Sequence, residues 1–230
     1  MPAVPGIYRQ DLEDRRYVLH EQGLLRGQEV VLDEETYSPL PPNDWIPPGT
    51  VVVRRQSAGR YVHPTHPDAA RNQPAAVSSL QPADQAWAGT VVTASLTPGL
   101  GFAVPLDQSA VDNPAVIDQL NQDPAFVAHF LADEDQAGNV RVRTRAAGAD
   151  QQLSVSSSLA AAFGPEGRAA HGTDADYRVT DAWAAVRELD GSPSHYMVPT
   201  LLAGHFDESE LVHLTPEARV VLSRRGSIFG

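Results

Sequence analysis

Prolines and glycines recur along the whole chain, and they restrict its possible folds more than any other feature of the sequence. The 230 residues include 19 prolines and 17 glycines. Five of the prolines fall within residues 39–49, where they exclude a helix and a central strand because proline lacks an amide donor. Apolar runs elsewhere are short and end at turn residues. The sequence therefore predicts a mainly β fold with many turns rather than a helical bundle.

Outside the middle of the chain, short strands and one late helix are predicted. The strongest strand covers residues 50–53, which are β-branched throughout. A turn at 57–59 and an apolar run at 60–63 make this strand the first half of a β-hairpin. Thr215 and Pro216 are typical of a helix start, with Thr215 as the N-cap. Other strands are expected at residues 17–20, 29–32, 89–94, 102–106, 177–180, 182–186 and 195–198.

Residues 105–170 have a different pattern, in which predicted helices and strands alternate. Asn113 and the proline after it are typical of a helix start, with Asn113 as the N-cap. A second helix is expected to start at Asp123 and to include Phe130 in its apolar stripe. Apolar residues and arginines alternate over 140–145, which predicts a strand with one buried face. The pattern indicates a small α+β module.

These patterns divide the chain into three predicted parts. Residues 1–16 are polar and interrupted by prolines, and we expect a flexible N-terminal arm there. Residues 17–104 and 171–230 are expected to form a β-rich core. The α+β module, residues 105–170, is expected to be inserted into that core.

The charge of the chain argues against a polyanionic partner. The sequence has 29 acidic and 17 basic residues, and its formal net charge is -12 at pH 7. The average field repels nucleic acids. No apolar run is long enough to span a membrane, and the N-terminal residues lack the pattern of a signal peptide. We therefore expect no nucleic acid and no membrane as a partner, and a soluble protein.

Histidines provide the best candidate for a metal site. His63, His66 and Asp68 are close together in the sequence, and His171 or His205 is a candidate for a further ligand from a distant segment. The prolines between them exclude a helical metal-binding motif. The favoured interpretation is that these are histidines of a surface loop. No metal and no cofactor are expected, and the absence of cysteine excludes thiolate ligands and disulfides.

No sequence pattern indicates a catalytic nucleophile. The G-x-S-x-G and S-x-x-K motifs are absent. Ser194 and His195 are adjacent in a predicted strand, so their side chains point to opposite faces. Arg141, Arg143 and Arg145 fit a polyanion or an acidic protein surface, but the solvated face of a strand is favoured. We therefore expect the chain not to be an enzyme.

Two stretches of the sequence are similar to the head decoration proteins of lambdoid and other tailed bacteriophages. Residues 47–53 (PPGTVVV) and 58–64 (AGRYVHP) resemble the Gly-Thr-Val strand, the short turn and the Gly-x-Tyr-Val strand of that family. Residues 197–211, a short helix and the closing residues 226–229 resemble its C-terminal portion. The similar parts are residues 45–65 and 177–230.

The predicted α+β module is similar to a different motif. Residues 120–126, 140–145, 147–150 and 153–155 resemble the small hook-insert motif of flagellar hook proteins and phage structural proteins. Both resemblances point to large assemblies. They imply a decoration-type β core that is interrupted by an inserted module.

The first resemblance implies a structural function without catalysis. The family consists of β-tulip or barrel-like subunits that form homotrimers on the outer surface of the virion. The trimers bind the major capsid protein at three-fold or quasi-three-fold sites of the expanded head and stabilise it against internal DNA pressure. The protein is expected to be made in the host cytoplasm. The expected capsid-binding residues are Ile7, Tyr8 and Leu12 in the arm and Trp45 and Ile46 in the proline-rich loop.

Two other classes of function are left open by the sequence. One is a carbohydrate-binding or adhesive β module on a virion or cell surface, assisted by a metal at His63, His66 and Asp68. Such a module would bind glycans through exposed aromatic residues. The other is a hydrolase whose active-site residues are scattered in the sequence. A hydrolase would have a deep pocket that contains groups with strongly shifted pKa values.

Overall fold

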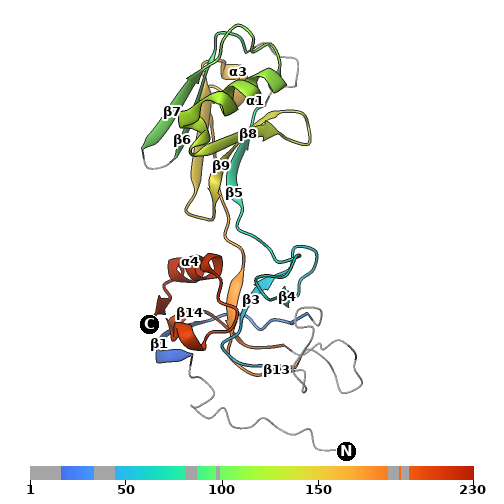
Figure 1. The fold of residues 1–230 in the computed structure, drawn as a ribbon, viewed down its shortest axis with the longest axis vertical. Helices are drawn as coiled ribbons and strands as arrows, with labels where there is room; N and C mark the ends of the chain where they lie inside the picture. Colours follow the sequence, from blue (N-terminus) through green and yellow to red (C-terminus); the bar gives the residue numbers. More distant parts are fainter. Residues whose placement is uncertain (1–16, 34–44, 81–86, 97–98, 186–191, 193–196) are drawn as a thin grey trace, which may run out of the picture. The chain divides into compact units, whose positions relative to one another are not determined.

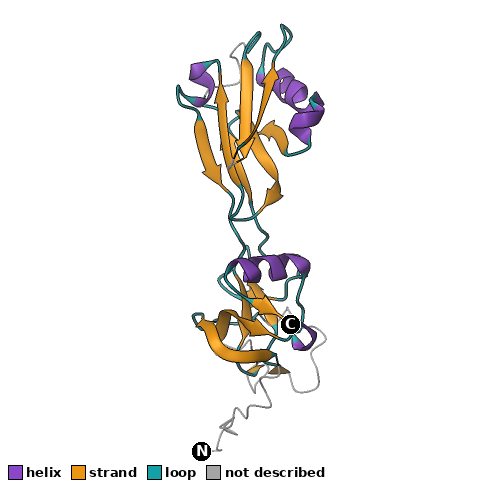
Figure 2. Cartoon of the chain, turned by 90° about the vertical axis from the view of Figure 1, so that its left-hand side faces the viewer, coloured by secondary structure: helices purple, strands orange, loops and turns teal. Residues whose placement is uncertain are grey.

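The chain folds into two units, each with hydrophobic core residues of its own. The computed structural model describes residues 17–33, 45–80, 87–96, 99–185, 192 and 197–230 (Figure 1). One unit, called the terminal unit, consists of Met1–Arg71 and Ala175–Gly230. The other, called the inserted unit, consists of Asn72–Asp174. Both are built mainly from antiparallel strands (Figure 2), which confirms the prediction of a mainly β fold. The predicted arm, residues 1–16, lies outside the described residues.

The strands of the terminal unit form one main sheet and one short ribbon. They are β1 (Val18–Arg26), β2 (Trp45–Ile46), β3 (Val51–Arg54), β4 (Tyr61–Val62), β12 (Tyr177–Thr180), β13 (Ala184–Ala185), β14 (Thr200–Phe206) and β15 (Ile228–Phe229). The main sheet has the order β1-β14-β12-β3-β4, with β15 beside β14. β2 and β13 pair separately and form the ribbon. Segments from the two ends of the chain therefore lie side by side in one sheet.

β3 carries apolar side chains that pack on both of its faces. Val51 and Val53 belong to a cluster that includes residues of helix α4 (Pro216–Arg224). Val52 belongs to a second cluster, together with Ile46 and Tyr61. A continuous β-branched run suits a strand that is covered on both faces. The predicted strand at 50–53 and its hairpin with β4 are both confirmed.

Helix α4 covers the first of these clusters and begins where the sequence predicts. Thr215 is the N-cap, and its Oγ1 accepts a hydrogen bond from the Ala218 amide at 3.2 Å. Ala218, Val221 and Leu222 are fully buried. Gly226 follows the helix with φ +94°, a conformation that favours glycine. The chain then returns as β15, parallel to β14. The 3₁₀-helix η3 (Glu208–Glu210) lies between β14 and α4.

The inserted unit contains two sheets and several short helices. Its elements are β5 (Pro74–Ser78), β6 (Val91–Leu96), β7 (Leu100–Pro105), α1 (Asn113–Gln122), α2 (Pro124–Val127), β8 (Phe130–Glu134), β9 (Val140–Ala147), β10 (Gln152–Ser157), α3 (Ala160–Phe163) and β11 (Arg168–His171). One sheet has the order β11-β10-β6-β7 and the other has the order β5-β9-β8. Side chains from both sheets and from the helices form one core, and its largest members are Trp87, Phe126, Phe130 and Phe163.

The inserted unit begins earlier in the sequence than predicted. The expected insertion was 105–170, whereas the structure assigns Asn72–Asp174 to this unit. β5, β6 and all but the last residue of β7 fall within the predicted core at 17–104, but β5 pairs with β9 and β6 pairs with β10. The apolar pattern of one strand does not reveal the sheet to which it belongs, because pairing is decided by distant residues.

Two details of the predicted helices also differ from the structure. The N-cap of α1 is Asp112, whose side chain accepts a hydrogen bond from the Ala115 amide at 2.9 Å. Asn113 lies inside the helix, where its Oδ1 accepts a hydrogen bond from the buried Trp87 indole at 3.0 Å. α2 ends after one turn, and Phe130 begins strand β8 instead of completing a helical stripe.

The ends of the inserted unit are held together by its own backbone. Gln73 and Thr173 exchange two hydrogen bonds, with N–O distances of 2.8 and 3.1 Å. Within the terminal unit, the backbone of Arg54 bonds both flanks of the insertion point. Its carbonyl accepts from Ala70 at 2.9 Å, and its amide donates to Asp176 at 3.3 Å. These hydrogen bonds therefore join the ends of the chain segments within each unit.

We expect each unit to fold when it is produced alone. Residues 72–174 should form a cooperative β domain, and a chain in which a short glycine linker joins Arg71 to Ala175 should retain the main sheet. Circular dichroism and amide NMR spectra of the two fragments measure this directly. An unfolded spectrum for either fragment would contradict the independence of the units.

Candidate functional site

The predicted binding residues that the structure describes have opposite environments. Trp45 is 38% exposed, whereas Ile46 is 2% exposed and packs in the second cluster of the terminal unit. Successive residues of a strand point to opposite faces, so β2 turns Trp45 outward and Ile46 inward. The prediction that Ile46 contacts a partner is therefore wrong for its side chain. Ile7, Tyr8 and Leu12 lie outside the described residues.

The structure adds a second tryptophan that the sequence reasoning missed. Ala184 lies opposite Ile46 and Ala185 lies opposite Trp45 in the ribbon. Trp183 directly precedes β13 and is 41% exposed, so strand alternation places it on the same side of the ribbon as Trp45. We call these two residues the tryptophan face. The predicted strand at 182–186 contains Trp183, but its uniformly apolar sequence hides which side chains point outward.

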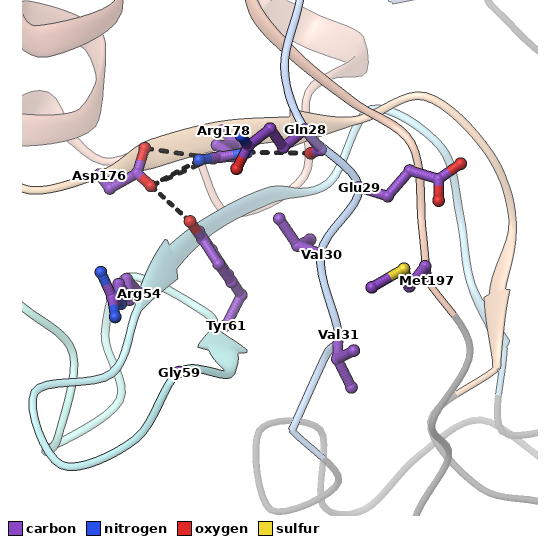
Figure 3. A pocket seen from close by; sticks show the side chains of 10 residues that line it. All are labelled: Gln28, Glu29, Val30, Val31, Arg54, Gly59, Tyr61, Asp176, Arg178 and Met197. Atoms are coloured by element: carbon purple, nitrogen blue, oxygen red, sulfur yellow. Dashed lines mark hydrogen bonds and ion pairs between the residues drawn. The ribbon is translucent and has the colours of Figure 1, made fainter.

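A pocket of about 320 Å³ lies elsewhere on the terminal unit (Figure 3). Apolar and charged groups share its walls, and Met197 is 64% exposed at its rim. The segment before β2 contributes through Val30, which exchanges backbone hydrogen bonds with Val198. The residues that line the pocket are Gln28, Glu29, Val30, Val31, Arg54, Gly59, Tyr61, Asp176, Arg178 and Met197.

A hydrogen-bonded network forms one wall of the pocket (Figure 3). Arg178 donates from Nη2 to Asp176 Oδ2 at 2.8 Å and from Nη1 to the Gln28 carbonyl at 2.9 Å. The Tyr61 hydroxyl donates to the same carboxylate. The Arg178 guanidinium also lies over the Tyr61 ring, with its carbon 5.2 Å from the ring centre. These groups hold one another in place, and this arrangement fixes the shape of the wall.

The network sets the protonation states of its members. Burial raises the pKa of Asp176. The hydrogen bonds from Arg178 and Tyr61 and the nearby arginine charges lower it by more than burial raises it, so the net pKa is below the usual 3.8. Burial, and then the hydrogen bond to Asp176, raise the pKa of the Tyr61 phenol. At neutral pH, Asp176 is therefore an ion whose oxygens are occupied by donors, and Tyr61 is neutral. Asp176 positions its neighbours rather than serving as an accessible base.

The histidines considered as metal ligands do not gather around one point with a carboxylate. The His63 ring lies 5.7 Å from that of His66 between ring centres. Asp68 is held instead by Arg55, at 2.7 Å. His171 belongs to the inserted unit, and His205 on β14 has its ring 5.6 Å from that of His20. Among the described residues, no group of three or more His, Asp or Glu side chains has a geometry that holds a metal ion.

The arginine stripe of β9 is tied to the neighbouring strand. Arg141 and Arg143 each form an ion pair with Asp133 of β8, at 2.7 and 3.1 Å. Arg145 donates to the backbone carbonyl of Val127. These partners favour the interpretation of a solvated strand face over that of a polyanion site.

Comparisons with known proteins leave the family of this chain open. No protein-family model matches it, and no curated protein matches it. One solved structure, the D2–D3 domains of the flagellar cap protein FliD from Serratia marcescens, aligns over 76% of this chain and 91% of that one. The identity is 11% and the TM-score is 0.37, which is too low to support an argument about fold or function. In the described ranges, no helix has both the length and the apolarity needed to cross a membrane.

We expect Asp176→Asn to destabilise the terminal unit by about 1.5–3 kcal/mol at pH 7, because hydrogen bonds to a charged group are lost. Since the folded-state pKa of Asp176 lies below 3.8, its contribution is present above that pH and disappears as the pH falls further. Hydrogen exchange of the β12 and β14 amides measures this change. The control is Asp107→Asn in the inserted unit, which should leave these amides unchanged. Equal exchange rates in wild type and D176N would show that the network is not stabilising.

Proposed function

We propose that this chain is a structural decoration protein that binds the outer surface of a tailed-phage head. The observation that carries this proposal is the arrangement of the two stretches that resemble the decoration family. Residues 45–65 and 177–230 are separated by the inserted unit, yet both belong to the terminal unit. They pair directly, with Tyr177 opposite Val53 and Val179 opposite Val51. Two distant resemblances to one family are more informative when the residues that carry them build one sheet.

The inserted unit accounts for the length of the chain beyond that of a decoration domain. It interrupts the terminal unit between Arg71 and Ala175, and its ends are joined by its own hydrogen bonds. An insertion of this kind adds a domain without breaking the sheet that receives it. The binding function is therefore assigned to the terminal unit, and we assign no catalytic step to the chain.

The tryptophan face is the surface to which we assign contact with the major capsid protein. Trp45 and Trp183 are both about two-fifths exposed and share one side of the β2–β13 ribbon. Exposed tryptophans are enriched among the residues that dominate binding energy at protein interfaces. The arm residues Ile7, Tyr8 and Leu12 stay predicted contacts. The homotrimer and the location on the virion surface are part of the same proposal.

The exposed tryptophans also favour one alternative, the carbohydrate-binding or adhesive module. Flat aromatic rings that stand out from a β ribbon offer apolar surface to a sugar as well as to a protein. The two functions differ in the partner, which is a folded capsid lattice in one case and an isolated glycan in the other.

We expect the purified protein to sediment with expanded, undecorated shells assembled from the major capsid protein of the same genome. Trp45→Ala and Trp183→Ala should each weaken binding by about 2 kcal/mol or more, which is roughly thirtyfold in Kd. The matched control is Val111→Ala, because Val111 is 58% exposed on the inserted unit. This variant should bind as wild type does.

Light scattering on the same samples tests the proposed trimer. A monomer that fails to sediment with the shells would contradict the decoration function. Binding to a glycan array that is lost in both tryptophan variants would replace it with the adhesive function.

A further inference from the structure

Three imidazole rings meet in the terminal unit at a junction of two distant segments. His63 follows strand β4, and His213 lies between η3 and α4. The His63 ring lies 5.5 Å from the His213 ring and 5.7 Å from the His66 ring, measured between ring centres. We call His63, His66 and His213 the histidine trio. The proposed capsid-binding function does not use these residues.

The segment around His213 is held to the main sheet on one side and to the core on the other. The amide of Val51 donates to the Val212 carbonyl at 2.8 Å, and the Val212 amide donates to Gly49 at 3.1 Å. Leu214 packs against the cluster that α4 covers. His213 itself has φ +62°, a left-handed conformation that is unfavourable for a residue with a side chain. Surrounding contacts, including that with the tilted His63 ring, are needed to maintain it.

One hydrogen bond shows that this arrangement suits a neutral imidazole. The Asp68 amide donates to Nδ1 of His66 at 3.1 Å, so that nitrogen carries no proton. Nδ1 of His63 lies 2.7 Å from the Thr65 hydroxyl. Protonation of His63 places a positive charge next to both other imidazoles.

The charged groups near the trio are engaged with other partners. On the loop that carries His63 and His66, Asp68 accepts from Arg55 and from Ser57. Arg71 of the same loop donates to the Pro64 carbonyl at 3.0 Å, and it lies 3.8 Å from Glu217 of α4. Burial, and then the neighbouring His213 and His66, lower the pKa of His63. Burial also lowers the pKa of His213. No carboxylate is among the causes of either shift.

We propose that the histidine trio is an acid-sensitive latch, which holds the loop after β4 against the segment before α4 at neutral pH and releases it as His63 and His213 become protonated. Two or more positive charges at these distances repel one another in a half-buried position. Release frees the His213 segment from its strained conformation and loosens the attachment of α4.

The direction of the pH effect follows from linkage. The pKa values of His63 and His213 are lower in the folded state than the 6.5 of an ordinary imidazole. The unfolded or opened state therefore binds protons more readily, and the stabilisation by the latch is present above pH 6.5 and is lost as the pH falls below it. The carboxylates with lowered pKa values, including Asp68 and Asp176, lose their contributions only below 3.8. The two effects occupy separate pH ranges.

Hydrogen exchange on the full chain at pH 7.5 and pH 5.5 tests the latch, with rates corrected for the intrinsic pH dependence. We expect the protection of residues 61–70 and 211–218 to be lower at pH 5.5 than at pH 7.5. The loss should be about tenfold for each pH unit by which a histidine pKa lies below that of an ordinary imidazole. The double variant His63→Gln, His213→Asn should change less than twofold over this range. Asparagine is chosen at 213 because it tolerates the left-handed conformation. His171→Gln in the inserted unit is the control and should behave as wild type does.

Three results would overturn the proposal. The first is that protection of these segments is the same at both pH values. The second is that the double variant loses as much protection as wild type. The third is an NMR titration of the wild-type ring protons in which His63 and His213 have pKa values of 6.5 or higher. The titration needs no substitution, so it decides the question even if the double variant does not fold.

Discussion

The terminal unit depends on the pairing of β12 with β3. Residues 177–179 lie opposite residues 51–53, and β12 also pairs with β14, so this strand connects the two halves of the main sheet. Closing so long a loop costs entropy when the intervening chain is disordered. Here the intervening chain is a folded unit whose ends are joined at Gln73 and Thr173. Once that unit has folded, only residues 54–72 and 174–176 remain in the loop that has to close. The folding of the insertion therefore lowers the entropic cost of this contact relative to a disordered segment of the same length.

Local rules predicted the local features of this fold well. The β3–β4 hairpin, the amphipathic strand β9 and the start of α4 each depend on neighbouring residues, and each is found near its predicted position. Errors appear where distant residues decide. Phe130 fits a helical stripe by spacing, but its pairing with Thr144 places it in a sheet. Asn113 has the sequence of an N-cap, but the buried Trp87 indole needs its oxygen as an acceptor. The domain boundary was misplaced for the same reason.

The candidate binding face shows the same division between local and distant information. Alternation along β2 separates Trp45 from Ile46, which the sequence alone treated as equivalent anchors. Trp183 joins Trp45 only through the pairing of β2 with β13, two segments that are far apart in the chain. No signal within either segment reveals this neighbour. The residues of a surface that is built by two short strands can therefore be identified only after the strand pairing is known. The exposure of each side chain then shows which residues belong to it.

Acid sensitivity in this chain arises from groups of two chemical kinds. In the terminal unit, Asp68 and Asp176 have lowered pKa values because guanidinium and hydroxyl groups bond them. Burial lowers the pKa values of His63 and His213, and neighbouring imidazoles lower that of His63 further, because both oppose a positive charge. Protonation removes an attraction in the first case and creates a repulsion in the second. In the inserted unit, Asp107 and Asp135 have lowered pKa values through hydrogen bonds from nearby amides and side chains. Because imidazoles take up protons at higher pH than carboxylates do, the proposed latch between the loop after β4 and the segment before α4 responds before these carboxylates do when the pH falls.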